Sequence, residues 1–207
     1  MGIITEIKGR KGKRAGIYID GRLTLTLNLE TVVQEGLRTD TEINPGRLAE
    51  LAEQDQVYRC REAAIRFLGY RPRSESELRD RLTKRGFNAE IITEVINRLK
   101  ERGLVDDAAF ARFWTENRES FRPRSQTLTR RELKQKGLAE DVIDQAVGGI
   151  NDEENAYLVA GSRARRMTIT DYQDLRKRLG DYLRRRGFSY ETINHTIEKI
   201  WRELGKQ

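Results

Sequence analysis

The stretch Leu82-Thr83-Lys84-Arg85-Gly86-Phe87 recurs as Leu133-Lys134-Gln135-Lys136-Gly137-Leu138 and again as Leu183-Arg184-Arg185-Arg186-Gly187-Phe188. The copies are 51 and 50 residues apart, and apolar residues beyond each glycine keep the same offsets without a gap. These residues are Ile92, Ile96 and Leu99, then Ile143, Val147 and Ile150, then Ile193, Ile197 and Ile200. Self-similarity at a fixed period of this length indicates a repeated structural unit.

Local signals around each glycine predict helices on both sides of it. Cations precede each glycine, as expected where a left-handed glycine closes a helix and positive charge meets its negative end. Ser74-Glu75-Ser76-Glu77 has the form of a capping box that opens the helix before the first glycine, and Asn88 and Ser189 stand where a cap opens the helix after one. Arg71-Pro72-Arg73-Ser74 also recurs as Arg122-Pro123-Arg124-Ser125. We therefore expect a three-helix unit with a tight turn between its second and third helices.

These units define the expected fold class, which is mainly α. Three tandem three-helix repeats, at residues 58–105, 106–150 and 151–207, are expected to stack into an elongated, curved array. Residues 1–43 are expected to form a small three-stranded antiparallel β meander and a short helix. Asn44-Pro45 predicts the start of a connecting helix over residues 44–57, and its pattern leaves room for a break near residues 54–56.

The meander is predicted from two apolar runs, at residues 3–7 and 15–19, and a third strand in which Leu23, Leu25 and Leu27 alternate with threonines. Asp20-Gly21 predicts a type I′ hairpin turn between the second and third strands. The loop at residues 8–14 carries five cations. Such a loop is usually a solvated tip, and the alternative is a contact with a phosphate backbone.

The charge of the chain indicates an anionic partner, either nucleic acid or an acidic protein surface. The formal net charge is +7, and residues 1–56 carry eight Lys and Arg against nine Asp and Glu, so the excess belongs to the helical repeats. Cations recur at matching positions, and a stacked array would align them into a stripe that follows phosphates without reading sequence. The candidate DNA- or filament-binding residues are Arg71, Arg73, Arg81, Arg122, Arg124, Arg130, Arg131, Lys134, Arg163, Arg165, Arg166, Arg184 and Arg185.

The alternative reading is that these cations cover an ordinary solvated face and close helix ends, which is the favoured reading at Arg85, Lys136 and Arg186. A second alternative concerns the aromatic residues Phe110, Phe113, Trp114 and Phe121, which could stack on bases. Their spacing of three and four fits an apolar helix face, so core packing is the favoured interpretation, as it is for Trp201.

The sequence carries no pattern typical of a catalytic, metal or nucleotide site. The single histidine, His195, is expected on a helix surface, and the acidic runs Asp106-Asp107 and Asp152-Glu153-Glu154 are expected to open helices and not to hold a nuclease metal. We therefore expect no enzyme activity, catalytic residue, metal or cofactor. The single cysteine, Cys60, excludes an internal disulfide, and no targeting or membrane-spanning stretch is present, so a cytoplasmic protein is expected.

Four stretches together resemble the RecX regulatory proteins, in their long form with an N-terminal β extension. They are Arg73-Ser74-Glu75-Ser76-Glu77-Leu78, Lys84-Arg85-Gly86-Phe87, Gly103-Leu104-Val105-Asp106-Asp107-Ala108-Ala109-Phe110-Ala111 and Arg131-Glu132-Leu133-Lys134-Gln135-Lys136-Gly137-Leu138. One departure is that the third unit has Tyr172-Gln173-Asp174-Leu175 at the positions of the Arg-Pro-Arg-Ser loop.

The resemblance implies a monomeric regulator that binds the RecA filament in DNA repair, homologous recombination and the SOS response. By that likeness it lies along the filament groove and hinders ATP hydrolysis, strand exchange and co-protease action. The likeness also implies contact with single- or double-stranded DNA, and no membrane. The alternative is a sequence-independent DNA-binding protein that affects RecA only indirectly. A metal-dependent nuclease is the remaining enzymatic alternative.

Overall fold

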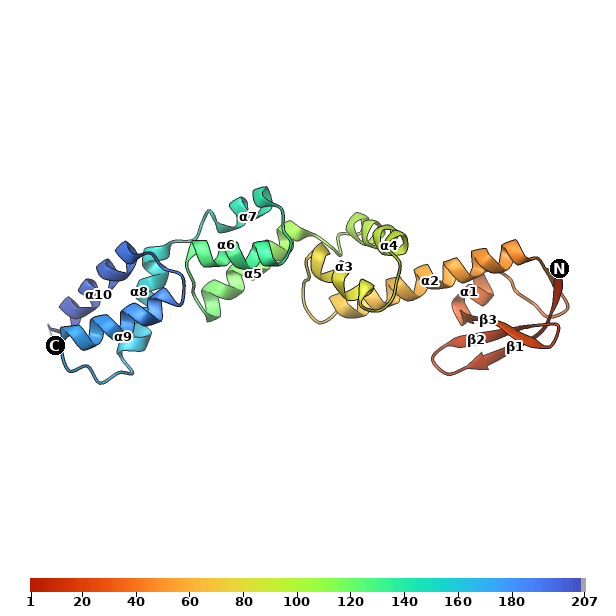
Figure 1. The fold of residues 1–207 in the computed structure, drawn as a ribbon, viewed down its shortest axis with the longest axis horizontal. Helices are drawn as coiled ribbons and strands as arrows, with labels where there is room; N and C mark the ends of the chain where they lie inside the picture. The colour runs from red at the N-terminus through yellow and green to blue at the C-terminus, as the bar shows by residue number, and fades with distance from the viewer. Residues whose placement is uncertain (206–207) are drawn as a thin grey trace. The chain divides into compact units, whose positions relative to one another are not determined.

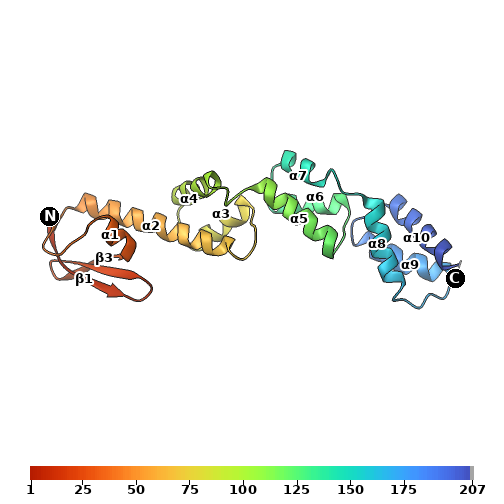
Figure 2. The same cartoon turned by 180° about the vertical axis from the view of Figure 1, so that it is seen from behind.

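A computed structural model describes residues 1–205, drawn in Figure 1 and from behind in Figure 2. The chain forms two compact units, and each is described by itself. The first contains Met1–Arg71 and Leu78–Leu104, and the second contains Pro72–Glu77 and the chain from Val105 onward. An antiparallel sheet comes first and helices follow it, which confirms the predicted mainly α class with a β region at the N-terminus.

The sheet of the first unit has four strands, one more than predicted. The strands β1 (Gly2–Arg10), β2 (Arg14–Ile19), β3 (Arg22–Asn28) and β4 (Glu42–Ile43) lie in the order β3-β2-β1-β4. Asp20 and Gly21 have φ of 48° and 78°, as the predicted type I′ turn requires. The missed strand β4 has two residues, which is too short for an alternating pattern, and it pairs with Gly2 and Ile3 of β1.

The sheet core contains Ile4, Ile17, Leu27 and Leu51, so the sheet packs on the first turns of α2 (Pro45–Leu68), and α1 (Leu29–Gln34) adds Val32. The predicted alternation in β3 is only partly realised, because Leu27 is buried and Leu23 is exposed. The strand therefore enters the core only toward its C-terminal end.

Arg14 belongs to the structure of the first unit and not to a solvated basic tip. Its guanidinium donates to Asp55 Oδ2 at 3.0 Å, and the backbone N–H of Asn28 donates to Asp55 Oδ1 at 2.8 Å. Asp55 lies on α2 and is buried, so this pair ties β2 and β3 to the helix. The exposed turn of the hairpin is accordingly shorter than the predicted loop of residues 8–14.

One helix serves both the sheet and the first repeat. α2 begins as predicted, with the Asn44 side chain accepting from the N–H of Arg47 and Pro45 in the first turn. It continues without interruption through residues 54–56, where the sequence left room for a break. Its second half packs beside α4 (Ala89–Glu101), and α3 (Glu75–Thr83) completes the three helices of the first repeat.

Cys60 provides a reporter for unfolding of the first unit. Its side chain is fully buried on α2, and this burial raises the pKa of the thiol to about 11. Because the thiolate is the reactive form, we expect iodoacetamide at pH 8 to alkylate Cys60 at least about a hundredfold more slowly in the native protein than in urea. Mass spectrometry over time measures both rates, and rapid alkylation in native buffer would contradict this burial.

The second unit contains the other two repeats. Its helices are α5 (Asp107–Phe121), α6 (Gln126–Gln135), α7 (Glu140–Val147), α8 (Asp152–Ala164), α9 (Tyr172–Arg184) and α10 (Tyr190–Leu204). One core contains Phe110, Leu133 and Ile143, and the other contains Leu183 and Ile193. In each repeat the leucine of the second helix and the isoleucine of the third helix are buried in a core. This confirms that the sequence repeat corresponds to a repeated three-helix unit.

The three glycine turns have the same geometry. Gly86, Gly137 and Gly187 have φ of +85°, +77° and +86°. In each turn the N–H of the residue after the glycine donates to the carbonyl of the repeated leucine at 3.4 Å, as in the N–H of Phe87 to the oxygen of Leu82. This is the predicted left-handed helix cap, and only glycine adopts its φ without strain.

Candidate nucleic-acid and protein interface

The Arg-Pro-Arg-Ser loops recur because each one packs on a glycine turn. Ser74, in the part of the first loop that belongs to the second unit, caps α3 by accepting from the N–H of Glu77 at 3.1 Å. Its hydroxyl donates to the carbonyl of Lys136, beside the Gly137 turn, at 2.7 Å. In the second loop the N–H of Ser125 donates to the carbonyl of Arg186 at 3.0 Å. These motif residues therefore have structural roles.

Two aspartates complete the same contact in both places. The N–H of Glu75 donates to Asp107 Oδ1 at 2.8 Å, and the N–H of Gln126 donates to Asp152 Oδ1 at 2.6 Å. Each aspartate stands in the first turn of its own helix, as predicted, and in addition caps a helix that is distant in sequence. Burial raises the pKa of Asp152, against the opposing effect of this hydrogen bond.

Own-helix capping falls to the preceding residues, Asp106 for α5 and Asn151 for α8. Within residues 1–205 the structure brings together no group of three His, Cys, Asp or Glu side chains that could hold a metal ion. His195 is exposed, with Nδ1 3.7 Å from Glu153, as predicted for a surface histidine.

In the third repeat, the residues that align with the Arg-Pro-Arg-Ser loop begin α9 and pack within the repeat itself. Asp171 caps α9 by accepting from the N–H of Asp174 at 2.9 Å. The next residue, Tyr172, packs edge to face on Trp201, with ring centroids 5.6 Å apart. The departure of this stretch from the loop motif therefore follows from a different local role.

Several candidate cations are engaged inside the protein. Arg124 pairs with Glu132, Arg130 with Asp144 and Glu140, Lys134 with Glu140, and Arg184 with Asp181. Hydrogen bonds to Asp144 and Glu140 raise the pKa of Arg130, and the hydrogen bond from Lys134 lowers that of Glu140. Arg71 and Arg73 are half-buried and also take part in internal interactions.

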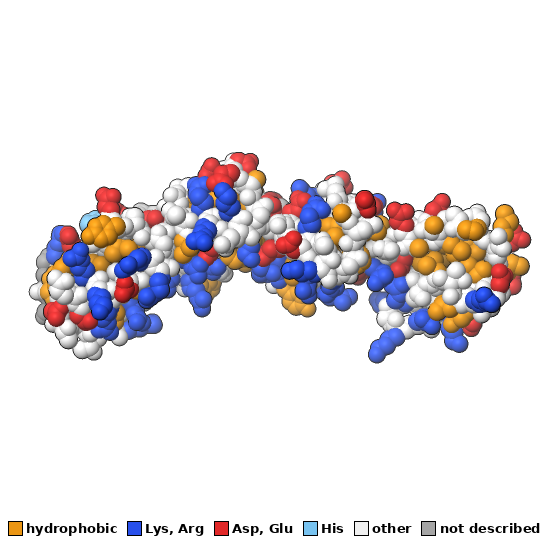
Figure 3. Space-filling view, in the orientation of Figure 1, with side chains coloured by type: hydrophobic (Ala, Val, Ile, Leu, Met, Phe, Trp, Pro, Cys, Tyr) orange, Lys and Arg blue, Asp and Glu red, His pale blue; other side chains and the backbone are white. Residues whose placement is uncertain are grey.

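The remaining candidates are exposed, and within the described part of the chain no acidic side chain pairs with them. They are Arg81, Arg122, Arg131, Arg163, Arg165, Arg166 and Arg185. Figure 3 shows Lys and Arg side chains gathered over α8 and α9 and at the end of α5, whereas Asp and Glu gather over α7. Arg163 lies in the last turn of α8, and Arg165 and Arg166 directly follow the helix; we call these three residues the α8-end arginines. They carry the largest uncompensated charge among the predicted residues.

A second concentration of positive charge surrounds the second Arg-Pro-Arg-Ser loop. The pKa of Arg124 is lowered, first by burial and then by repulsion from Arg118, Arg186 and Arg122. We call these four residues the second-loop arginines. Glu132 is their nearby counter-charge: it accepts from Arg118 Nε at 2.7 Å and pairs with Arg124. One carboxylate thus faces several guanidiniums.

Phe121 is exposed, contrary to the core packing expected from its spacing. It is the last residue of α5, and 78% of its surface is accessible. The other aromatic residues of α5 follow the expectation more closely, since Phe110 is buried and Trp114 packs against the core. Tyr70, at the matching position of the first repeat, is 79% exposed. Both exposed rings could have been found in the sequence, because each aromatic residue directly precedes an Arg-Pro pair.

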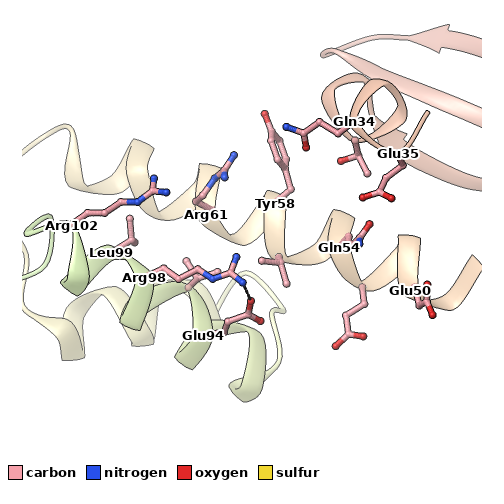
Figure 4. Close-up of a pocket in the computed structure, with 14 residues that line it drawn as sticks. Gln34, Glu35, Glu50, Gln54, Tyr58, Arg61, Glu94, Arg98, Leu99 and Arg102 are labelled. Carbon is pink, nitrogen blue, oxygen red and sulfur yellow. Dashed lines mark ion pairs between the residues drawn. The ribbon is translucent and has the colours of Figure 1, made fainter. Parts of the chain in front are cut away.

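The first unit also has a cavity of about 530 Å³ between α1, α2 and α4. Figure 4 shows Arg61, Arg98 and Arg102 toward one end of it and Glu35 and Glu50 toward the other. Arg98 pairs with Glu94 at 2.6 Å. The cavity mixes charges of both signs, so it does not single out one class of ligand. None of its residues was predicted as a site.

Comparison with known proteins identifies the repeats. Residues 60–99, 106–147 and 151–197 match the first, second and third three-helix domains of RecX. The regulatory protein RecX of Chlorobaculum tepidum is 36% identical over 137 residues, which cover 66% of this chain and 85% of that protein. The chain belongs to the RecX family. The regulatory protein RecX of Clostridium botulinum strain Alaska E43 is 28% identical over 199 residues, covering 94% of this chain and 93% of the relative.

Solved RecX structures share the fold. A crystal structure of regulatory protein RecX superposes with a TM-score of 0.69 at 23% identity, covering 96% of this chain and all of that one. RecX from Lactobacillus salivarius gives a TM-score of 0.62 and covers 70% of this chain. The three domain matches begin at residue 60, but the first of these structures covers nearly the whole chain, so the similarity extends into the N-terminal sheet.

Membership confirms the predicted resemblance and the non-enzymatic class, because RecX proteins are regulators of RecA and not enzymes. A separate finding concerns membranes. No helix within residues 1–205 combines the length and the apolar character that crossing a bilayer requires.

Proposed function

We propose that this RecX protein binds RecA nucleoprotein filaments along their groove and lowers RecA ATPase, strand-exchange and co-protease activity. The observation that supports this most is the set of exposed arginines without acidic partners on its three-helix repeats, in a chain whose family regulates RecA. A RecA filament presents many identical subunits assembled on DNA, which is a polyanion. A protein built from repeats can contact several RecA subunits at once.

Inhibition follows from binding if the protein prefers one arrangement of neighbouring RecA subunits. A ligand shifts an equilibrium by its difference in affinity for the two states, so a protein that bridges subunits opposes the rearrangement that accompanies ATP hydrolysis. The α8-end arginines are the proposed main contact in the third repeat, because all three are exposed and lie within four residues at the end of α8.

The test is a titration of the single-stranded-DNA-dependent ATPase of RecA. We expect the rate to fall at ratios of one copy of this chain per RecA subunit or less. Reversing the α8-end arginines together, as Arg163→Glu, Arg165→Glu and Arg166→Glu, is expected to raise the half-inhibitory concentration at least about tenfold, since each lost charge contact costs on the order of 1 kcal/mol. Arg202→Glu is the control for a charge reversal elsewhere on the third repeat, because Arg202 is exposed, pairs with Glu198 and is not among the candidate residues. An unchanged ATPase over a wide range of ratios would contradict the proposal.

The second candidate function is sequence-independent DNA binding that affects RecA only indirectly. The same exposed arginines favour it. Here the chain alone should bind DNA with a steep dependence on salt, and the triple variant should weaken binding to every sequence equally. Fluorescence anisotropy at several salt concentrations measures both properties.

A further inference from the structure

We propose that Phe121 and the second-loop arginines form a binding site for single-stranded nucleic acid. A base stacks on the ring of Phe121, and the flanking phosphates bind Arg122 and its neighbours. The inference rests on the DNA binding named as the second candidate function, does not require RecA, and assigns that binding to a particular structural element.

The ring of Phe121 is held away from the core by the lengths of the helices. α5 has 15 residues, whereas its partners α6 and α7 have 10 and 8. Figures 1 and 2 both show the C-terminal end of α5 projecting beyond those two helices. Phe121 ends this projecting turn with 78% of its surface accessible. An accessible aromatic face is what an unpaired base needs for stacking.

The loop that follows Phe121 is fixed in place before any ligand arrives. The N–H of Arg122 donates to the carbonyl of Arg118 at 2.9 Å, which closes the helix. Arg186 then holds the loop at two points, with its carbonyl accepting from the N–H of Ser125 at 3.0 Å and its Nη1 donating to the carbonyl of Pro123 at 3.1 Å. A fixed loop loses little conformational entropy on binding.

The charge around the ring suits a phosphate backbone. Among the described residues, Arg122 is exposed and has no acidic partner, while Arg118 and Arg124 share the single carboxylate of Glu132. The pKa of Arg124 is lowered first by burial and then by repulsion from the neighbouring guanidiniums, and an anion would relieve that repulsion. Arginine binds phosphate with two parallel hydrogen bonds, so the exposed Arg122 offers the contact, and the partly buried arginines behind it add positive charge.

The surroundings of Phe121 favour a base over an apolar protein face. From residue 105 to residue 150, all of which the structure describes, Phe121 is the only large apolar residue that is exposed. An aromatic anchor in a protein interface is normally ringed by further contacts that exclude water. A single ring among cations is instead the combination found where single strands are bound without sequence preference. Tyr70 of the first repeat is also exposed, but the arginine that follows it, Arg71, is half-buried and takes part in internal interactions.

The test compares a fluorescent oligo-dT strand with a duplex of equal length, in anisotropy titrations of the chain without RecA. Phe121→Ala is expected to weaken binding to the single strand at least about fivefold and to leave the duplex unchanged, because duplex bases are already stacked on one another. Phe121→Trp should retain binding to the single strand. Leu158→Ala, another exposed apolar residue, is the matched control and should change neither.

Arg122→Ala tests the phosphate half of the site. It should weaken binding to both single strand and duplex and reduce the slope of log affinity against log salt by about one. Circular dichroism verifies that each variant is folded. The inference is overturned if the wild-type chain does not bind the single strand, or if Phe121→Ala changes strand and duplex affinities equally. It is also overturned if that variant loses only its effect on RecA, which would make Phe121 a protein contact. A flat ATPase titration would reject the proposed function alone, so the two failures are distinguishable.

Discussion

Replacing Gly187 by alanine is expected to lower the free energy of unfolding of the second unit by about 3 kcal/mol or more. Gly86→Ala, at the matching turn of the first repeat, is expected to cost about 1–2 kcal/mol. Both glycines have nearly the same positive φ, so both variants carry the same backbone strain. The comparison therefore isolates what surrounds each turn.

The surroundings differ sharply. A Cβ at Gly86 would meet no atom within 4 Å. A Cβ at Gly187 would lie 2.6 Å from Ser125 Oγ and 2.7 Å from Leu128 Cβ. The Cβ of Leu128 is fixed to the backbone of α6 and cannot rotate away, so the second loop would have to separate from the turn. A Cβ at Gly137 would collide with the Cβ of Ser76, so Gly137→Ala is expected to behave like Gly187→Ala.

The two units can be monitored separately during urea unfolding. Both tryptophans, Trp114 and Trp201, lie in the second unit, so their fluorescence reports on Gly187→Ala. Alkylation of buried Cys60 reports on Gly86→Ala in the first unit. Equal losses in the two variants would contradict the packing of the second loop on the Gly187 turn.

Replacing Glu132 by alanine is expected to destabilise the second unit by about 3 kcal/mol. The Glu132 side chain is only 11% exposed, and it accepts from Arg118 Nε at 2.7 Å and from Trp114 Nε1 at 2.9 Å while pairing with Arg124. Its removal leaves two partly buried guanidiniums without a counter-charge and the indole N–H without an acceptor. The measurement is urea unfolding followed by circular dichroism.

Two controls separate charge from hydrogen bonding. Glu132→Gln retains an acceptor for Trp114 and loses only the charge, so its cost should lie between those of wild type and Glu132→Ala. Glu198→Ala removes an exposed pair with Arg202 on α10 and should cost no more than about 0.5 kcal/mol. If Glu132→Ala costs no more than Glu198→Ala, the carboxylate does not hold the second-loop arginines together.

The features that the sequence predicted well are local ones. The glycine turns, the caps at Asn44, Asn88 and Ser189, and the Asp20-Gly21 hairpin each depend on a few adjacent residues whose backbone preferences agree. The repeat added a second source of information, because a leucine buried in one copy is buried in the others. Fold class and helix order therefore followed from the sequence.

The features that the sequence did not predict depend on contacts between distant residues. Asp107 and Asp152 had the composition of ordinary helix caps, and only folding shows that each reaches a different helix. Arg130 and Lys134 looked like unpaired surface cations in the sequence. The fold places Glu140 beside both of them across the α6–α7 turn, and each pairs with it. For Phe121, the spacing of apolar residues identified the buried face of the helix. It did not show that the neighbouring helices stop short of the end of α5, which leaves Phe121 exposed.

Direct binding to the filament is the most decisive measurement. RecA is assembled on single-stranded DNA with a slowly hydrolysed ATP analogue until no DNA is exposed, and the RecX chain is added and sedimented with the filaments. We predict that the chain sediments in a fixed, saturable ratio to RecA and that the reversed α8-end arginines weaken this binding. Sedimentation with naked DNA but not with fully covered filaments would contradict the account.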